Sequence, residues 1–475
     1  MDSTSESVSG TGVFAILRRA LSASRHVRKT LMISNHLRIL TLVLFGGTAG
    51  YSQTTLNTSA SRGIGHPQLL PNNQVSTANP NLVEGRELFS PQSLALDPSF
   101  SPPALYVGDT GNNRVLGWKN ATNFANGKPA DLVVGQSDFF STRPGGPSTA
   151  FTAGLSAPVG LAVFGGDLYV VDAGNNRVLR FRTPFSTPPD QQFPDLIVGQ
   201  PNLASRVADY PAGFPTEKGI FLASNNGALQ ANIAFDKQGN LWLADAGNRR
   251  VLMYPASEVA KSNNFGLPAT IVIGQTDFLS AAVLDTSSVS RTNQLAIPTG
   301  LAFDSSGRLY VSDSDNSNNS GDPLNRVLVF TPSSSGQFSS GQSASRIMGL
   351  LTPLPQGVPP PDQRTQLTQQ LQIRMNSPNS IFFLPGNQGM GVVDSNWSRI
   401  LIFDPYEQWP DPGTATSPSA KAVVGQGGIY VKPDGTAAIQ ANAGNPRSSA
   451  QSFSFRPGPS FSTTSSTWPI PAITA

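Results

Sequence analysis

Few side chains in this sequence are suited to catalysis. The chain of 475 residues has three histidines and no cysteine. His26 and His36 lie within the first 52 residues, and His66 precedes every repeated segment described below. The repeats therefore lack the residues for a three-histidine zinc site or a Ser-His-Asp triad, and the chain has none for thiolate chemistry or disulfides.

One acidic segment has residues that suit a hard cation. Asp313, Asp315 and Asp322 lie in a stretch rich in Asn and Ser. Carboxylate and amide oxygens are the ligands that Ca²⁺ prefers, but the spacing lacks the glycine at position six and the glutamate at position twelve of an EF-hand loop. The segment predicts either a calcium site or an ordinary solvated loop, and no other cofactor is expected.

Most of the recurring charged residues belong to a phrase that occurs five times. In each copy a short apolar run ends in aspartate, and arginine follows after a turn. The ten residues are Asp109, Asp172, Asp245, Asp313, Asp394, Arg114, Arg177, Arg250, Arg326 and Arg399. Because a pair repeated in every unit suits a scaffold, we expect the aspartates to hold their turns, and the arginines to bind carbonyls or a neighbouring unit's aspartate.

The residues around each phrase predict four β-strands. In the fourth unit, the runs 298–303, 309–313 and 326–330 are rich in Val, Leu, Tyr and Phe and are bounded by turn residues. A further apolar run ends in Gly-Gln in four units, at Gln136, Gln200, Gln275 and Gln426. Four-stranded antiparallel units that recur along a chain form an all-β fold, the β-propeller, in which each unit is one blade.

The unit resembles the NHL repeat. The resemblance rests on the pattern Pro-x-Gly-Leu-Ala-Phe, Gly-x-Leu-Tyr-Val-x-Asp and Asn-x-Arg-Val-Leu-x-Phe, extends over about residues 88–426, and is to exported bacterial proteins. It implies a propeller that usually has six blades. A position that often carries histidine in this family holds Asn113, Asn176 and Arg249 here. The resemblance thus implies the fold and says little about histidine-dependent chemistry.

Five units are clear, and the two ends of the predicted propeller (residues 81–438) suggest a sixth. Residues 81–86 resemble the rim strand of a blade, and residues 428–435 have the pattern of a hairpin. Closure of the ring removes exposed sheet edges, so a degenerate sixth blade built from both ends is expected. Five blades with a loose tail are the alternative.

The residues outside the propeller predict a leader and two flexible flanks. Basic residues precede the apolar run 39–50, and small residues follow it, as in a signal peptide that spans residues 1–52 and starts at Met1 or Met32. An uncleaved anchor is the alternative, although the run is shorter than the about 20 residues of a membrane span. Residues 53–80 predict a disordered linker, and residues 439–475 a Ser/Thr/Pro-rich tail that either contributes to closure or joins a further domain.

Without this leader the charge is nearly balanced. The chain has 32 Lys and Arg against 29 Asp and Glu, and residues 1–52 hold six of the bases and two of the acids. Nothing in the remaining composition supplies the basic surface that nucleic-acid binding needs. Contact with a membrane is expected only through an uncleaved leader.

Strand order places the longest connections at one end of the blades. If the Pro-x-Gly strand lines the axis, the links after Gly-Gln emerge beside the repeated aspartates, in residues 137–157, 201–229, 276–294 and 350–374. Insertions in repeat proteins commonly mark the binding side. We therefore expect a secreted, periplasmic or cell-surface monomer that is not an enzyme and that binds a protein, peptide or polysaccharide. The alternative is a lyase or hydrolase with a carboxylate-held divalent ion at the axis.

Overall fold

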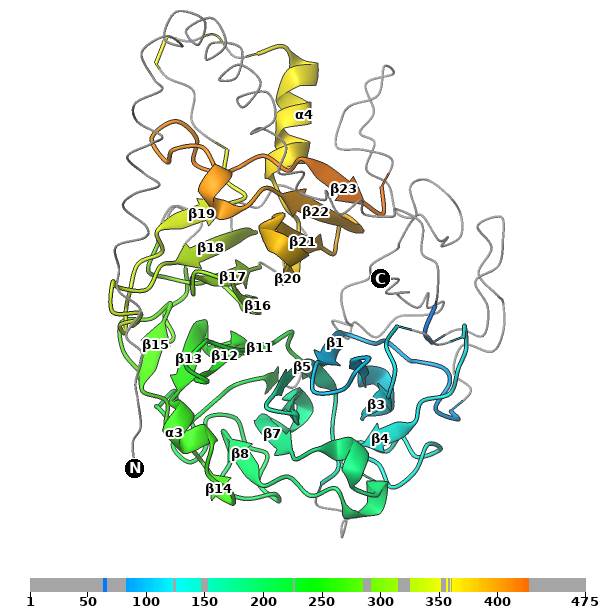
Figure 1. Ribbon diagram of the computed structural model, residues 1–475. Helices are drawn as coiled ribbons and strands as arrows, with labels where there is room; N and C mark the ends of the chain where they lie inside the picture. Colours follow the sequence, from blue (N-terminus) through cyan, green and yellow to red (C-terminus); the bar gives the residue numbers. More distant parts are fainter. Residues whose placement is uncertain are drawn as a thin grey trace, which may run out of the picture. The chain divides into compact units, whose positions relative to one another are not determined.

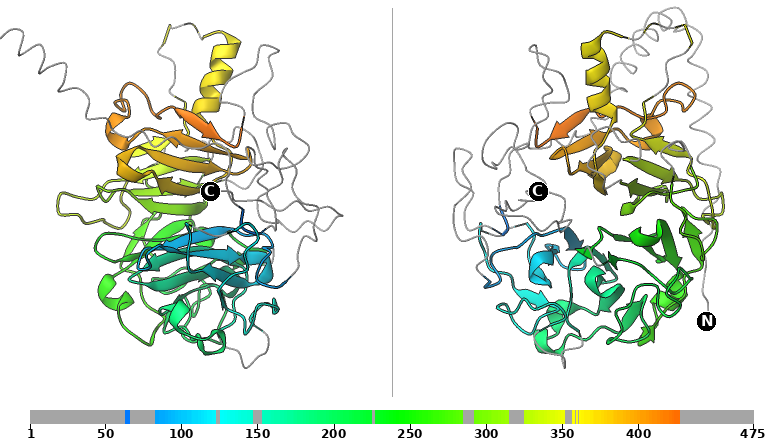
Figure 2. Two further views of the ribbon diagram at one scale, coloured as in Figure 1. Left: turned by 45° about the vertical axis from the view of Figure 1, so that its right-hand side comes forward. Right: turned by 180° about the vertical axis from the view of Figure 1, so that it is seen from behind.

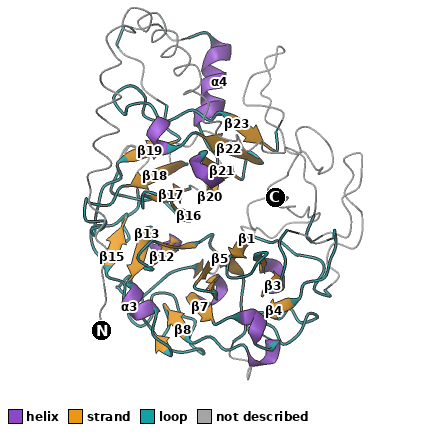
Figure 3. Ribbon diagram, viewed as in Figure 1, coloured by secondary structure: helices purple, strands orange, loops and turns teal. Residues whose placement is uncertain are grey.

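The computed structural model describes residues 63–65 and 83–426, apart from short segments at 123–124, 147–152, 225–226, 285–291, 315–324, 352–355, 358 and 360. Strands dominate these residues, and helices are few and short (Figure 3). The described residues form five blades with four antiparallel strands each, so the predicted all-β propeller is confirmed.

The first two blades follow each other directly in the chain. Blade 1 consists of β1 (Ser93–Asp97), β2 (Ala104–Asp109), β3 (Arg114–Trp118) and β4 (Leu132–Val134). Blade 2 consists of β5 (Pro158–Phe164), β6 (Asp167–Asp172), β7 (Arg177–Phe181) and β8 (Leu196–Val198). A fifth strand, β14 (Asn264–Phe265), comes from the next blade and pairs with β8 in parallel.

The other three blades repeat this order. Blade 3 consists of β11 (Ile233–Phe235), β12 (Leu241–Asp245), β13 (Arg250–Tyr254) and β15 (Ile271–Ile273). Blade 4 consists of β16 (Pro298–Phe303), β17 (Leu309–Asp313), β18 (Arg326–Phe330) and β19 (Arg346–Met348). Blade 5 consists of β20 (Pro378–Phe383), β21 (Met390–Asp394), β22 (Arg399–Phe403) and β23 (Ala422–Val424).

The remaining elements lie in the connections between these strands. The 3₁₀ turns are η1 (Thr110–Asn112), η2 (Ala173–Asn175), η3 (Pro184–Ser186), η4 (Pro189–Gln191), η5 (Ala246–Asn248), η7 (Pro385–Asn387) and η8 (Tyr406–Gln408). A small hairpin joins β9 (Ala223–Ser224) to β10 (Gly227–Ala228), and α3 (Ala256–Val259) precedes β14. The longest helix among the described residues, α4 (Gln363–Ile373), extends away from the sheets in both views of Figure 2.

Consecutive blades pack face to face along an arc, with blade 1 and blade 5 at its ends (Figure 1). Inner strands approach each other closely because glycine leaves room for the backbone of the next blade. A Cβ atom at Gly160 would lie 2.6 Å from the carbonyl oxygen of Ala231, and one at Gly300 would lie 2.5 Å from that of Asn379. The glycine of the Pro-x-Gly pattern is thus a requirement of blade packing.

One cross-strand pair shows the same arrangement in the first four blades. An alanine on the inner strand lies opposite an aromatic residue on the second strand, in the pairs Ala95–Tyr106, Ala162–Tyr169, Ala234–Trp242 and Ala302–Tyr310. Blade 5 inverts the pair, because Phe382 lies opposite Gly391. A Cβ atom at Gly391 would lie 2.2 Å from the Phe382 ring, so the ring occupies the space above the glycine.

The predicted sixth blade is not confirmed by the described residues. The segment 83–86, part of the predicted rim strand, forms a turn, and Glu87 makes an isolated bridge to Gly65. Residues 428–435, the predicted hairpin, lie outside the described part of the chain. The leader and the linker up to residue 62 also lie outside it, as does the tail.

Candidate binding face

Each blade contains a buried ion pair between its second and third strands. The aspartate that ends the second strand lies opposite the arginine that begins the third, and both side chains are fully buried. The distance from Nε to Oδ2 is 2.7 Å in four pairs and 3.0 Å in the fourth blade; the pairs are Asp109–Arg114, Asp172–Arg177, Asp245–Arg250, Asp313–Arg326 and Asp394–Arg399. Each arginine therefore pairs with the aspartate of its own blade, and the expected pairing with a neighbouring blade is wrong.

Further donors surround the buried carboxylates. Oδ1 of Asp172 accepts a hydrogen bond from the backbone N–H of Ser156 at 2.6 Å, and Oδ2 accepts one from Nδ2 of Asn175 at 2.8 Å. Burial raises the pKa of Asp313 to about 6, against the lowering effect of Arg326. Carboxylates engaged in this way hold the turns together and offer little to a ligand.

The arginines also fix the links that leave the first three blades. A guanidinium N–H of Arg177 donates to the carbonyl of Leu203 at 2.7 Å, and a second one donates to the carbonyl of Gly154 at 2.9 Å. Arg114 and Arg250 hold the carbonyls at the corresponding points of their own links. The ion pairs thus position the long links directly.

A side-chain turn at the start of a link directs one residue inward and the next outward. Oδ1 of Asp138 accepts hydrogen bonds from the backbone N–H groups of Phe140 and the residue after it, both at 2.8 Å. Phe139 packs against the core of blade 1, whereas Phe140 is 73% exposed. Asp277 accepts the N–H of Leu279 in the same way at 2.9 Å. The turn therefore presents an apolar side chain to solvent.

Apolar side chains are exposed on three of the predicted links. Leu279 is 65% exposed, and the whole set consists of Phe140, Val207, Tyr210, Phe214, Leu279 and Val283. The links leave the ends of β4, β8 and β15, which point the same way in their blades. We call these six residues the apolar link set.

Amide side chains tie the second link to its own blade and to the next one. Nε2 of Gln200 donates to the carbonyls of Asn176 and Val207, both at 2.8 Å. Asn176 donates from Nδ2 to the carbonyl of Arg206 at 3.1 Å, and its Oδ1 accepts the backbone N–H of Leu222 at 2.8 Å, where the chain enters blade 3. This asparagine is therefore a bridge between two blades.

The same bridge recurs in two other blades, and the sequence alone did not predict it. Oδ1 of Asn113 accepts the N–H of Ala157 at 2.8 Å, and Oδ1 of Asn325 accepts the N–H of Ser377 at 2.9 Å. Asn113 has a left-handed backbone with φ of 54°, a conformation that asparagine tolerates better than most residues. Asparagine at the position where the family often has histidine was the available signal, but its partner lies in another blade.

One acidic residue of the second link is buried. Oδ1 of Asp209 accepts a hydrogen bond from Nδ2 of Asn248 at 2.7 Å, and the same amide group donates to Oδ2 of Asp245 at 2.9 Å. Burial raises the pKa of Asp209, and the nearby Asp245 raises it as well, although the bond from Asn248 opposes them. The link is therefore anchored through an amide shared by two carboxylates.

Only one of the three predicted calcium ligands lies in the described part of the chain. The carboxylate of Asp313 pairs with Arg326 and accepts the N–H groups of Ala296 and Ile297 at 2.7 and 2.9 Å, whereas Asp315 and Asp322 lie outside the described residues. Among the residues that the structure describes, no three His, Cys, Asp or Glu side chains are grouped closely enough to bind a metal ion.

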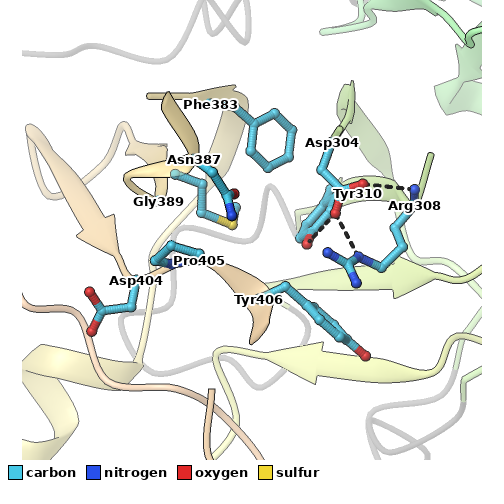
Figure 4. Close-up of a pocket in the computed structure, with 10 residues that line it drawn as sticks. Asp304, Arg308, Tyr310, Phe383, Asn387, Gly389, Asp404, Pro405 and Tyr406 are labelled. Atoms are coloured by element: carbon cyan, nitrogen blue, oxygen red, sulfur yellow. Dashed lines mark hydrogen bonds and ion pairs between the residues drawn. The ribbon is translucent and has the colours of Figure 1, made fainter. Parts of the chain in front are cut away.

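A small pocket lies at the other end of blades 4 and 5 (Figure 4). Arg308 stands in its wall, pairs with Asp304 at 2.6 Å and with Glu407, and lies 3.9 Å above the ring of Tyr406. The pocket has a volume of about 10 Å³, about the space that a single water molecule needs. Its paired charges and small size indicate a contact between blades.

Comparison with protein families supports the assignment of the repeat. The model of the NHL repeat matches residues 155–181 and 295–319, which lie in blades 2 and 4. The chain is a β-propeller that contains NHL repeats. No curated protein matches the sequence of this propeller. Within its described residues, none of the helices has the length and apolar character needed to cross a membrane.

Several solved structures share features with this NHL propeller. A streptogramin B lyase is 12% identical, with 68% of this chain and 67% of that chain covered and a TM-score of 0.33. The PQQ-bound aldose sugar dehydrogenase from Streptomyces coelicolor is 16% identical (72% and 82% covered, TM-score 0.37). A chain of a nidogen/laminin complex is 11% identical (72% and 87% covered, TM-score 0.36). At these values the likeness carries no inference about activity.

Proposed function

We propose that this NHL propeller is an exported, non-enzymatic scaffold that binds a protein or peptide through its long links. The observation that carries the proposal is the apolar link set, which the buried ion pairs and side-chain turns hold on the outside of the blades. Aromatic residues are enriched in protein interfaces, and charged residues are depleted at their centres.

The aliphatic members of the set favour a protein or peptide over a polysaccharide. Val207, Leu279 and Val283 are aliphatic and exposed, and they offer neither hydrogen bonds nor a ring to stack on a sugar. Burial of such side chains by an apolar partner is favourable at about 25 cal/mol per Å² of surface removed from water. Binding of a polysaccharide is the alternative that the experiment must distinguish from binding of a protein.

The test compares matched variants of the exported chain in quantitative capture from its own culture medium. The double variant Phe140→Ser, Leu279→Ser removes two exposed side chains of the set. Phe193→Ser is the control, because Phe193 is 56% exposed but lies in the connection between β7 and β8 at the other end of its blade. We expect the double variant to lose the captured protein and the control to retain it.

Two results would contradict the proposal. Equal capture by the double variant and the intact chain would show that the link set does not bind the partner. Retention of the chain on isolated polysaccharide, reduced by the double variant and not by Phe193→Ser, would assign the same face to a sugar ligand. Circular dichroism of each variant ensures that the loss is not one of folding.

A further inference from the structure

One position of the repeat breaks the pattern at the end of the blades where the links emerge. It directly precedes the buried arginine of the third strand. The residues there are asparagine in blades 1, 2 and 4 and arginine in blade 3, namely Asn113, Asn176, Asn325 and Arg249. The backbone of Arg249 is left-handed, with φ of 55°, like that of Asn113 and Asn176. Arginine adopts this conformation less readily than asparagine, so the turn alone does not favour it here.

Arg249 cannot form the bridge between blades that the asparagines form. In blade 2, Oδ1 of Asn176 accepts the N–H of Leu222, whereas a guanidinium group has no acceptor. At the corresponding entry to blade 4, the N–H of Ile297 donates to Oδ1 of Asp313 at 2.9 Å. The side chain of Arg249 is partly exposed, and it makes no hydrogen bond or ion pair with any residue that the structure describes. Its charge is therefore available to a ligand.

The backbone of Arg249 lies beside the third link. Nε2 of Gln275 donates to the carbonyls of Arg249 and Ala282 at 3.2 and 3.1 Å, and Ala282 directly precedes Val283. Val283 is 70% exposed, and Leu279 of the same link is 65% exposed. The cationic side chain thus starts next to two members of the apolar link set.

Two further arginines lie on the first and second links. Arg206 directly precedes Val207 and reaches the first link, because a Cβ atom at Gly145 would lie 3.1 Å from both terminal nitrogens of its guanidinium group. Arg143 is exposed in the first link, shortly after Phe140. Within the described part of the chain, neither guanidinium group has a hydrogen bond or an ion pair. Each arginine therefore accompanies an exposed apolar side chain.

The carboxylates of these links are already engaged. Asp138 and Asp277 accept the N–H groups of their own turns, and Asp209 is buried. Glu217 is exposed, but the adjacent Lys218 balances its charge. The three arginines thus remain without compensation, and a complementary partner has to supply carboxylates.

We propose that the apolar link set binds a peptide segment that contains both apolar and acidic side chains, and that its Asp and Glu residues pair with Arg143, Arg206 and Arg249. This inference rests on the proposed function. Arginine suits the role because its planar guanidinium group forms paired hydrogen bonds with a carboxylate. The three arginines are carried by different links and blades, so several acidic side chains are needed and a single terminal carboxylate is not enough.

The first experiment selects ligands from a display library of random linear peptides. The immobilised full chain and its Arg249→Asn variant are used in parallel. We expect the peptides selected on the natural chain to be enriched in both acidic and apolar residues, and the acidic enrichment to fall on the variant. Apolar peptides without acidic enrichment would overturn this inference and leave the proposed function intact. Failure to select any peptide that depends on Phe140 and Leu279 would contradict the proposed function itself.

The second experiment measures the affinity of one selected peptide for matched variants. Arg249→Asn gives blade 3 the asparagine that bridges other blades, so we expect it to fold at least as stably as the natural chain. It should nevertheless bind the peptide about tenfold more weakly, as a lost charge-assisted hydrogen bond predicts. Lys119→Gln is the control, because Lys119 is exposed after β3 at the other end of blade 1, and it should bind like the natural chain.

Two outcomes of this titration would overturn the proposal. One is equal affinity of the natural chain and Arg249→Asn for the peptide. The other is tighter binding of polygalacturonate than of any selected peptide, reduced by Arg249→Asn, which would assign the arginines to an acidic polysaccharide.

Discussion

At the scale of single residues, the repeated aspartate and arginine do structural work in every blade. Their side chains are fully buried, and the guanidinium groups that pair with the carboxylates also reach the links. Such a pair contributes little net stability when intact, because both charges leave water, but removal of one partner leaves an uncompensated buried charge. The stability of blade 2 and the position of the second link therefore depend on both charges of this pair.

Asp172→Asn tests this sensitivity. The variant keeps the shape of the side chain but leaves Arg177 buried without a counter-charge, and we expect the free energy of unfolding to fall by about 3–5 kcal/mol. Asp190→Asn is the control, because Asp190 is exposed in η4, and its effect should stay within about 0.5 kcal/mol. Urea unfolding of both variants measures the difference; equal values would show that the pair is dispensable.

The buried carboxyl of Asp209 predicts that the stability of the propeller depends on pH. Its pKa is raised in the folded state, so its contribution to stability is fully present below the pKa of the unfolded chain and is lost as the pH rises through the folded value. Asp209→Asn retains an acceptor for Asn248 and cannot become charged. We expect the variant to be more stable than the natural chain at pH 7.

Thermal unfolding of Asp209→Asn and the natural chain between pH 4 and pH 7.5 checks this expectation. The difference in midpoint should shrink toward pH 4, where the natural carboxyl is increasingly protonated. A difference that is constant over this range would assign the effect to the left-handed backbone at Asp209, which asparagine tolerates well.

At the scale of elements, the sequence predicted the short strands but not the contacts that they make with segments of other blades. The predicted runs 309–313 and 326–330 match β17 and β18 because apolar residues and turn residues define them locally. β14 pairs with β8 although they belong to different blades, and α4 has mostly polar residues that give no amphipathic pattern. The Asn176 bridge was missed for the same reason, since local sequence does not contain the partner.

The inverted pair of blade 5 gives a prediction for a double-mutant cycle. Gly391→Tyr alone places new atoms inside the Phe382 ring and should be strongly destabilising. Phe382→Ala with Gly391→Tyr restores the arrangement of blades 1 to 4. We expect a favourable coupling of about 1–3 kcal/mol between the two changes, measured by urea unfolding of both single variants and the double variant. A coupling near zero would mean that the two positions do not share one space.

At the scale of the whole molecule, the repeat predicted the architecture but not which side chains form the surface. Five matching phrases predicted five blades, whereas the number six depended on ends that share little of the pattern. The long links were predicted by their length alone, but which of their side chains face solvent depends on the turns at Asp138 and Asp277 and on contacts between blades. The predicted calcium site depended on a segment that lies largely outside the described residues.

Truncation tests whether the tail, residues 439–475, contributes to closure of the propeller. If the tail contributes to closure, a chain that ends at Gln426 should unfold at a lower temperature than the full chain, and it should bind more of a dye that reports exposed apolar surface. A chain without residues 1–52 is the control and should keep the midpoint of the full chain. Equal midpoints for all three chains would show that the tail does not pack on the blades.

The outer edges of the blades have a consequence for solubility. The rim strands β4, β8, β15, β19 and β23 are each three residues long, and β14 occupies the outer edge of β8. Open sheet edges are templates on which other chains add strands and aggregate, and short or covered edges suppress this. The described circumference of the propeller is therefore poorly suited to strand addition by neighbouring molecules.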